Sequence, residues 1–159
     1  MLAPEAPIAP SLPLPDGPVV LFDGLCNFCN GAIQFIVDRE REPRLRFAPL
    51  QSELARALLE RAFGAEQAKL LREGTTGSGD PDTIVLVEGA GGVTRSTAGV
   101  RIAAHLRFPW RLLGVAVVIP RPLRDYLYGV IAKNRYRWFG KTETCRIPTP
   151  QLRSRFLAQ

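Results

Sequence analysis

The sequence contains few residues that form cross-links or bind metals: among its 159 residues are three cysteines and one histidine. Three thiols are too few, and odd in number, for a framework of structural disulfides. A chain of this length with 46% hydrophobic residues can bury one ordinary core without such cross-links. We therefore expect a single domain that works in a reducing compartment, the cytoplasm.

Long apolar runs are also absent. The longest, residues 112–119, is far shorter than the roughly 20 residues that span a bilayer. Residues 1–18 lack a basic start and a continuous apolar stretch, and they carry prolines at 4, 7, 10, 13, 15 and 18. We expect this segment to be flexible and extended rather than a secretory signal.

Acidic residues are scarce in the C-terminal third. Residues 101–159 contain 12 Lys/Arg and 2 Asp/Glu, whereas residues 1–100 contain 9 and 13. Such a basic surface predicts an acidic protein or an anionic membrane surface as a partner, bound peripherally through residues 101–159. Nucleic acid is disfavoured, because the arginines and aromatics of residues 134–141 form only a short run after an amphipathic helix. That context favours packing with the charges in water.

Signatures of nucleotide cofactors are missing as well. The chain has neither a P-loop nor a dinucleotide fingerprint, so we expect no cofactor. Electrons would have to be exchanged with an external donor or acceptor. Ser96 and Thr97 are interpreted as helix caps, because no nucleophile elbow accompanies them.

The most informative feature present is the pair of thiols Cys26 and Cys29, separated by Asn27 and Phe28. The pair follows a strand-like apolar run, residues 19–22, and begins a helix-like one. A thiol at a helix N-terminus faces unpaired backbone N–H groups and the positive end of the helix dipole, which lower its pKa. The thiolate is the species that attacks disulfides, so we predict disulfide exchange, with Cys26 attacking and Cys29 resolving.

Two other functions are compatible with the same residues. Zinc could take Cys26 and Cys29 together with Cys145 and His105, although a second close pair of ligands is missing. Alternatively, the cysteines are vestigial and the chain is a non-catalytic docking domain that uses its basic third. Cys145 could also resolve a mixed disulfide, pair between chains, or have no role.

Asp23 precedes the thiols and has two candidate roles. Its carboxylate could accept backbone N–H groups and shape the turn into the helix, or it could relay the proton of Cys29. A negative charge this close raises a thiol pKa, so the turn role is favoured. Replacing Asp23 by asparagine is predicted to alter the thiol pKa without unfolding the protein.

Hydrophobic periodicity predicts seven elements, in the order strand, helix, strand, helix, strand, strand, helix. They cover residues 19–22, 28–41, 45–48, 52–63, 83–87, 93–95 and 97–106, with Ser52 capping the second helix, Gly64 ending it, residues 74–81 as a flexible loop and residues 89–92 as a turn. The first two strands need a crossover and are therefore parallel, and the last two form an antiparallel hairpin. This order is that of the thioredoxin fold.

Several stretches resemble the DCC family of thiol-disulfide oxidoreductases, also called DUF393. The family's Asp and two Cys correspond to Asp23, Cys26 and Cys29. The other similar stretches are residues 47–52, 95–98, 119–125 and 134–141, with Cys145 following. The resemblance implies a thioredoxin-like α/β fold with a mixed sheet and protein-disulfide oxidoreductase activity, with Cys26 and Cys29 as the redox pair and Asp23 as the motif acid.

The resemblance leaves the direction of electron flow open. The intervening dipeptide Asn27-Phe28 matches neither the Gly-Pro of thioredoxins nor the Pro-Tyr common in glutaredoxins. Potentials of such proteins range from about −270 to −120 mV, which covers reductants and oxidants of protein or small-thiol disulfides. Pro81, two residues before Thr83, is a doubtful equivalent of the cis-proline that faces the sulfurs in thioredoxins.

The predicted organisation has three parts. Residues 1–18 form the proline-rich segment and residues 19–108 the redox domain. Residues 109–159 form a basic helical extension, with residues 123–135 helical, packed on the same domain.

Overall fold

The computed structural model describes residues 17–42, 44–74, 83–89 and 91–140. Its elements are β1 (Val19–Phe22), α1 (Asn27–Arg39), β2 (Arg46–Pro49), α2 (Glu53–Phe63), α3 (Ala65–Glu73), β3 (Val85–Glu88), β4 (Gly91–Thr94), α4 (Arg95–Ala103), the 3₁₀ helix η1 (Trp110–Val118) and α5 (Arg121–Phe139). Among these residues no helix combines the length and hydropathy needed to cross a bilayer.

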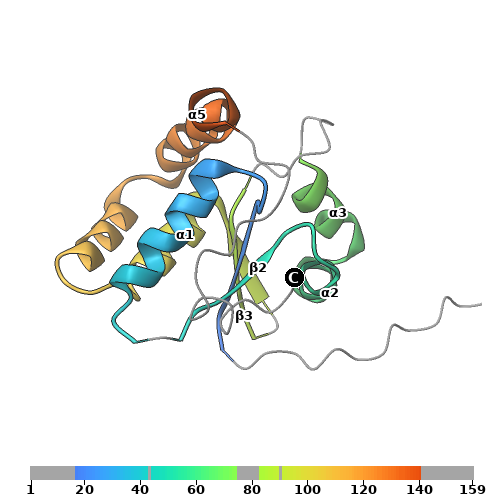
Figure 1. Cartoon of the computed structure of the whole chain (residues 1–159), viewed down its shortest axis with the longest axis horizontal. Coiled ribbons are helices and arrows are strands. Elements are labelled where there is room, and N and C mark those ends of the chain that lie inside the picture. Colours follow the sequence, from blue (N-terminus) through green and yellow to red (C-terminus); the bar gives the residue numbers. More distant parts are fainter. Residues whose placement is uncertain (1–16, 43, 75–82, 90, 141–159) are drawn as a thin grey trace, which may run out of the picture.

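The four strands form one mixed sheet in the order β2-β1-β3-β4. β1 runs parallel to β2 and antiparallel to β3, and β3 pairs antiparallel with β4. Helices cover both faces, with α1 on one side and α2 and α3 on the other (Figure 1). The predicted α/β class and thioredoxin-like sheet are confirmed.

β1 is buried on both faces and divides the core in two. Val20 and Phe22 belong to the cluster that includes residues of α1 and α4, whereas Val19 and Leu21 belong to the cluster of α2 and α3. All four side chains are at most 1% exposed, and burying each stabilises the fold by about 1.5–3 kcal/mol. β1 is therefore firmly fixed in the core, and the two thiols follow shortly after its end.

Two elements differ from the sequence prediction. Gly64 does end α2, but α3 follows it directly, a helix that the prediction missed. α4 begins at Arg95 with Thr94 as its N-cap residue and no side-chain cap. Ser96 does not cap it and instead donates a hydrogen bond to Asp125. The predicted flexible loop at residues 74–81 lies outside the described part of the chain, except for Gly74. Pro81, compared above with the cis-proline of thioredoxins, lies outside it as well.

The predicted turn at residues 89–92 is shorter in the structure, because β4 already begins at Gly91. Gly92 pairs with Val87 across the hairpin. A Cβ at residue 92 would lie 2.9 Å from a ring carbon of Phe63, closer than packed atoms allow. Glycine here lets α2 pack against the strand.

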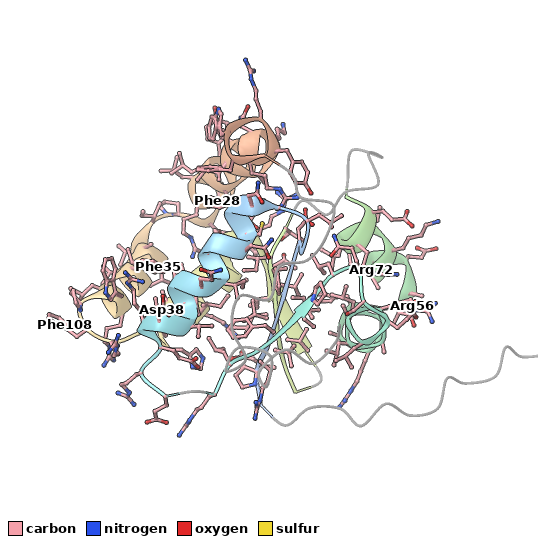
Figure 2. The ribbon with its side chains drawn as sticks, in the orientation of Figure 1. Phe28, Phe35, Asp38, Arg56, Arg72 and Phe108 are labelled. Atoms are coloured by element: carbon pink, nitrogen blue, oxygen red, sulfur yellow. The ribbon has the colours of Figure 1, made fainter. Side chains whose placement is uncertain are left out.

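The C-terminal helices pack beside the first helix. α5 contacts both α1 and α4, and η1 contacts α4. Phe28 lies at the start of α1 and Phe35 two turns further along it (Figure 2). Phe28 lies against Phe139 of α5 with ring centroids 4.9 Å apart, and Phe35 meets Trp110 of η1 at 5.1 Å. Residues far apart in sequence therefore meet along α1.

Candidate active site

Cys26 is the N-cap residue of α1. Its backbone is extended, and its sulfur accepts a hydrogen bond from the backbone N–H of Cys29 at 3.3 Å. The sulfur thus takes the place that a serine or aspartate oxygen usually occupies at a helix start. This placement is the one that the sequence predicted.

The two thiols have pKa values that move in opposite directions. A hydrogen bond from the Cys29 thiol, aided by the Cys29 N–H and the charge of Arg135, lowers the pKa of Cys26 from 9.0 to about 7, against burial and the charge of Asp23. The same thiol hydrogen bond, followed by burial and the charge on Cys26, raises the pKa of Cys29. At neutral pH the pair is suited to one thiolate and one thiol.

This difference predicts a thiolate that forms near pH 7. The ultraviolet thiolate absorbance of the reduced protein should rise with a midpoint near 7 rather than 9.0, and Cys26→Ser should remove that step. Cys29→Ala should move the midpoint upward, because it deletes the strongest stabilising hydrogen bond, whereas Cys29→Ser keeps a donor and should move it less. A wild-type midpoint near 9.0 would contradict the assignment.

Asp23 is the buried centre of a polar network. One carboxylate oxygen accepts the N–H of Leu25 at 3.0 Å and the side-chain amide of Gln51 at 2.8 Å. The other forms an ion pair with Arg135 at 3.2 Å and accepts the hydroxyl of Tyr136. The bond to Leu25 is the one expected for the turn role.

Arg135 lies inside the site. It is 5% exposed, and its Nη1 lies 3.5 Å from the sulfur of Cys29. The prediction that the charges of residues 134–141 lie in water is therefore wrong for Arg135, whereas Arg137 is exposed. Burial and the bond to Asp23 raise the pKa of Tyr136, so its hydroxyl stays protonated and donates.

The network changes what is expected of Asp23→Asn. The asparagine would leave the Arg135 guanidinium buried without its carboxylate, and breaking one side of a buried ion pair costs about 3–5 kcal/mol. The variant should therefore lose stability as well as alter the thiol pKa. The prediction that the variant does not unfold stays a prediction, and we now expect a marked loss of stability beside it.

The end of α5 lies over the start of α1. The side-chain amide of Asn27 donates to the carbonyl of Phe139 at 3.0 Å, and its backbone N–H donates to the carbonyl of Gly140 at 3.4 Å. Cys26 beside it is 0% exposed, whereas Cys29 is half-buried. Cys26 is closed to solvent in this structure, and we expect that opening of the contact between α5 and Asn27 exposes it.

Asn27→Ala should therefore speed alkylation of Cys26. Loss of a hydrogen bond worth about 1 kcal/mol raises the open population about fivefold, and peptide mapping after timed alkylation measures it. The matched control is Asn134→Ala, because within the described residues the Asn134 amide donates to the carbonyl of Val130 in α5 itself. Equal rates in the two variants would show that this contact does not limit access.

The ligands of the alternative zinc site are not brought together in the part of the chain that the structure describes. There, no three His, Cys, Asp or Glu side chains form a group that could hold a metal. His105 lines a small polar pocket with Arg41, Glu42 and Arg111. Cys145 lies outside the described residues.

Fold and site together define a thioredoxin-like protein with a Cys-x-x-Cys pair at the start of its first helix. The model of the DCC1-like thiol-disulfide oxidoreductase family matches residues 20–141. The chain belongs to this family, as the resemblance predicted.

Two relatives support the assignment. The chain is 42% identical over 139 residues to "Uncharacterized protein YuxK" of Bacillus subtilis, covering 87% of this chain and 93% of the relative. It is 35% identical over 131 residues to "DCC family protein At1g52590, chloroplastic" of Arabidopsis thaliana, covering 82% and 69%. No solved structure gives a significant match.

Proposed function

We propose that the protein is a protein thiol-disulfide oxidoreductase that works through Cys26 and Cys29. The Cys26 thiolate attacks a substrate disulfide, forms a mixed disulfide and expels one substrate thiolate, which takes up a proton. Cys29 then loses its proton and attacks the Cys26 sulfur, which releases the second substrate thiolate. Two electrons pass from the dithiol to the substrate, and the reverse sequence oxidises a substrate dithiol.

The observation that carries this proposal is the cap geometry of Cys26. Its sulfur accepts the Cys29 N–H at 3.3 Å, and its pKa is lowered to about 7. A nucleophile is most effective when its pKa lies near the working pH. The buried Arg135, 3.5 Å from Cys29, adds a positive charge that stabilises a thiolate on either sulfur.

Asp23 acts in this proposal as a positioning residue. Its ion pair holds Arg135 beside the thiols, and its hydrogen bond from the Leu25 N–H stabilises the turn before α1. It also raises the pKa of both thiols by its charge. These contacts favour positioning over proton relay.

A redox titration tests the proposal. Reduced protein is equilibrated in graded thiol/disulfide buffers, trapped by alkylation and read by intact mass and peptide mapping. We expect one reversible two-electron transition that maps to Cys26 and Cys29, and its midpoint separates a reductant from an oxidant. If no such transition occurs in the range of physiological buffers, the proposal fails.

Protein or small-thiol disulfides are the proposed substrates, with an external donor or acceptor, and the cytoplasm is the proposed location. We also propose residues 19–108 as the redox domain and residues 109–159 as its extension. The contribution of Arg135 and Tyr136 to the thiol site supports packing of the two as one unit. Docking to an acidic or anionic partner is tested by charge reversal at exposed Arg137, because reversal at Arg135 would disrupt the thiol site itself.

A further inference from the structure

An apolar cavity of about 530 Å³ lies between α1, α4, η1 and α5. Its volume falls in the range of small-molecule sites, roughly 300–1,000 Å³. Phe28 and Phe35 line it from α1, and Figure 2 shows them at the start and further along that helix. Nothing in the disulfide exchange proposed above requires a cavity of this size.

The wall of the cavity contains four side chains able to form polar contacts. Cys29 belongs to the redox pair, Tyr128 accepts the N–H of Ile84 at 2.7 Å, and Ser96 donates to Asp125. The fourth is Arg124, whose Nε and Nη1 are buried and have no hydrogen-bond partner in the described part of the chain. Arg124 is half-buried, and buried N–H donors without partners are costly, so the charge of this side chain favours an anion in the cavity.

We propose that this cavity binds a single-chain amphiphile with an anionic head group, a long-chain carboxylate. The apolar walls would surround the hydrocarbon chain of the ligand, and the positive charge of Arg124 would neutralise the negative charge of its head group. At about 30 Å³ per heavy atom, the share of one water molecule in the liquid, the cavity holds roughly 17 heavy atoms, which is enough for a chain of twelve carbons with its carboxylate.

The bound chain would also contact the redox site. Cys29 lines the cavity, so an occupant shields this thiol and slows its reactions. This consequence rests on the proposed function, whereas binding itself does not. Calorimetry measures binding of the ligand without any thiol chemistry. If the protein did not catalyse disulfide exchange, the measured binding would still be valid.

Calorimetric titration with dodecanoate below its micelle concentration tests the proposal. We expect one site per chain, weaker binding of neutral dodecanol and little binding of the cation dodecyltrimethylammonium. Arg124→Gln should lower dodecanoate affinity about tenfold, whereas Arg137→Gln, an equal loss of charge at an exposed position of α5, should change it less than about twofold.

A second pair of variants tests the location without removing charge. Gly99 lines the cavity at an exposed position, Gly31 of α1 is also exposed, and a Cβ at either glycine meets no atom within 4 Å. Gly99→Leu should fill the cavity and lower affinity at least about tenfold, while Gly31→Leu should not change it. Both replacements improve helix propensity, and unfolding curves check that they fold.

Three results would overturn the proposal. The first is no binding of free dodecanoate, which is also expected if an apolar protein segment is the occupant. The second is binding only to vesicles that contain dodecanoate, which would indicate a membrane surface. The third is undiminished binding by Gly99→Leu.

Discussion

Replacing Cys26 by serine is expected to abolish disulfide exchange, lowering its rate by on the order of a thousandfold or more. A serine hydroxyl stays protonated at neutral pH and does not attack disulfides. Cys29→Ser should instead capture the substrate, because the mixed disulfide on Cys26 then lacks its resolving thiol. Turnover of a model protein disulfide and intact mass of the trapped adduct measure the two effects.

The lowered pKa favours Cys26 as the nucleophile, whereas the greater exposure favours Cys29. The comparison of Cys26→Ser with Cys29→Ser decides between them. Cys26 has the lowered pKa but is 0% exposed, whereas Cys29 is half-buried and has a raised pKa. We assign attack to Cys26, because only a thiolate reacts, and we expect opening of the end of α5 to expose it. Adducts on Cys29 in the Cys26→Ser variant, with exchange retained, would reverse the roles. Adding Cys145→Ser to each variant shows whether the third thiol resolves the adduct.

Arg135→Met is expected to lower the free energy of unfolding by about 3–5 kcal/mol. Methionine keeps the length of the side chain but leaves the Asp23 carboxylate buried without its cation. The same change should raise the pKa of Cys26, because a positive charge that lowers it is removed. Urea unfolding of reduced protein and thiolate absorbance provide the two measurements.

The control for this prediction is Arg137→Met, at an exposed position of the same helix. It should change stability by less than about 0.5 kcal/mol. The double variant Asp23→Leu with Arg135→Met should recover much of the loss, because it leaves no unpaired buried charge. A loss below about 1 kcal/mol in Arg135→Met would show that the ion pair is not a structural centre.

Local patterns were sufficient to predict the first four elements of the fold. Four consecutive apolar residues followed by the thiol pair indicated β1 and the start of α1, and Ser52 indicated α2, where its hydroxyl does accept the Ala55 N–H at 3.1 Å. α3 carries only two buried residues, Ala68 and Leu71, and its N-cap residue, Gly64, has no side chain to mark a start. Its stability comes from packing against α2, which periodicity does not reveal.

The candidate site was predictable only as far as its local residues. Asp23, Cys26 and Cys29 lie within seven positions, so their spacing is visible in the sequence. Arg135 and Tyr136 reach the site from 112 and 113 residues beyond Asp23. One signal was available for Arg135: it lies seven residues, two helical turns, after Tyr128, on the same face of α5. Tyr128 is half-buried, and its hydroxyl accepts the N–H of Ile84, so a prediction that this face packs against the domain would have suggested burial of Arg135.

The distance along the chain between the thiols and Arg135 affects the order in which the site matures during synthesis. A ribosome adds about 5–20 residues per second, so Cys26 and Cys29 leave it several seconds before α5 does. Until α5 docks, the nascent chain has its thiols without the guanidinium of Arg135 and without the helix end that contacts Asn27. Docking of α5 is therefore the step that adds the charge of Arg135 to the hydrogen bonds from Cys29 that already lower the pKa of Cys26.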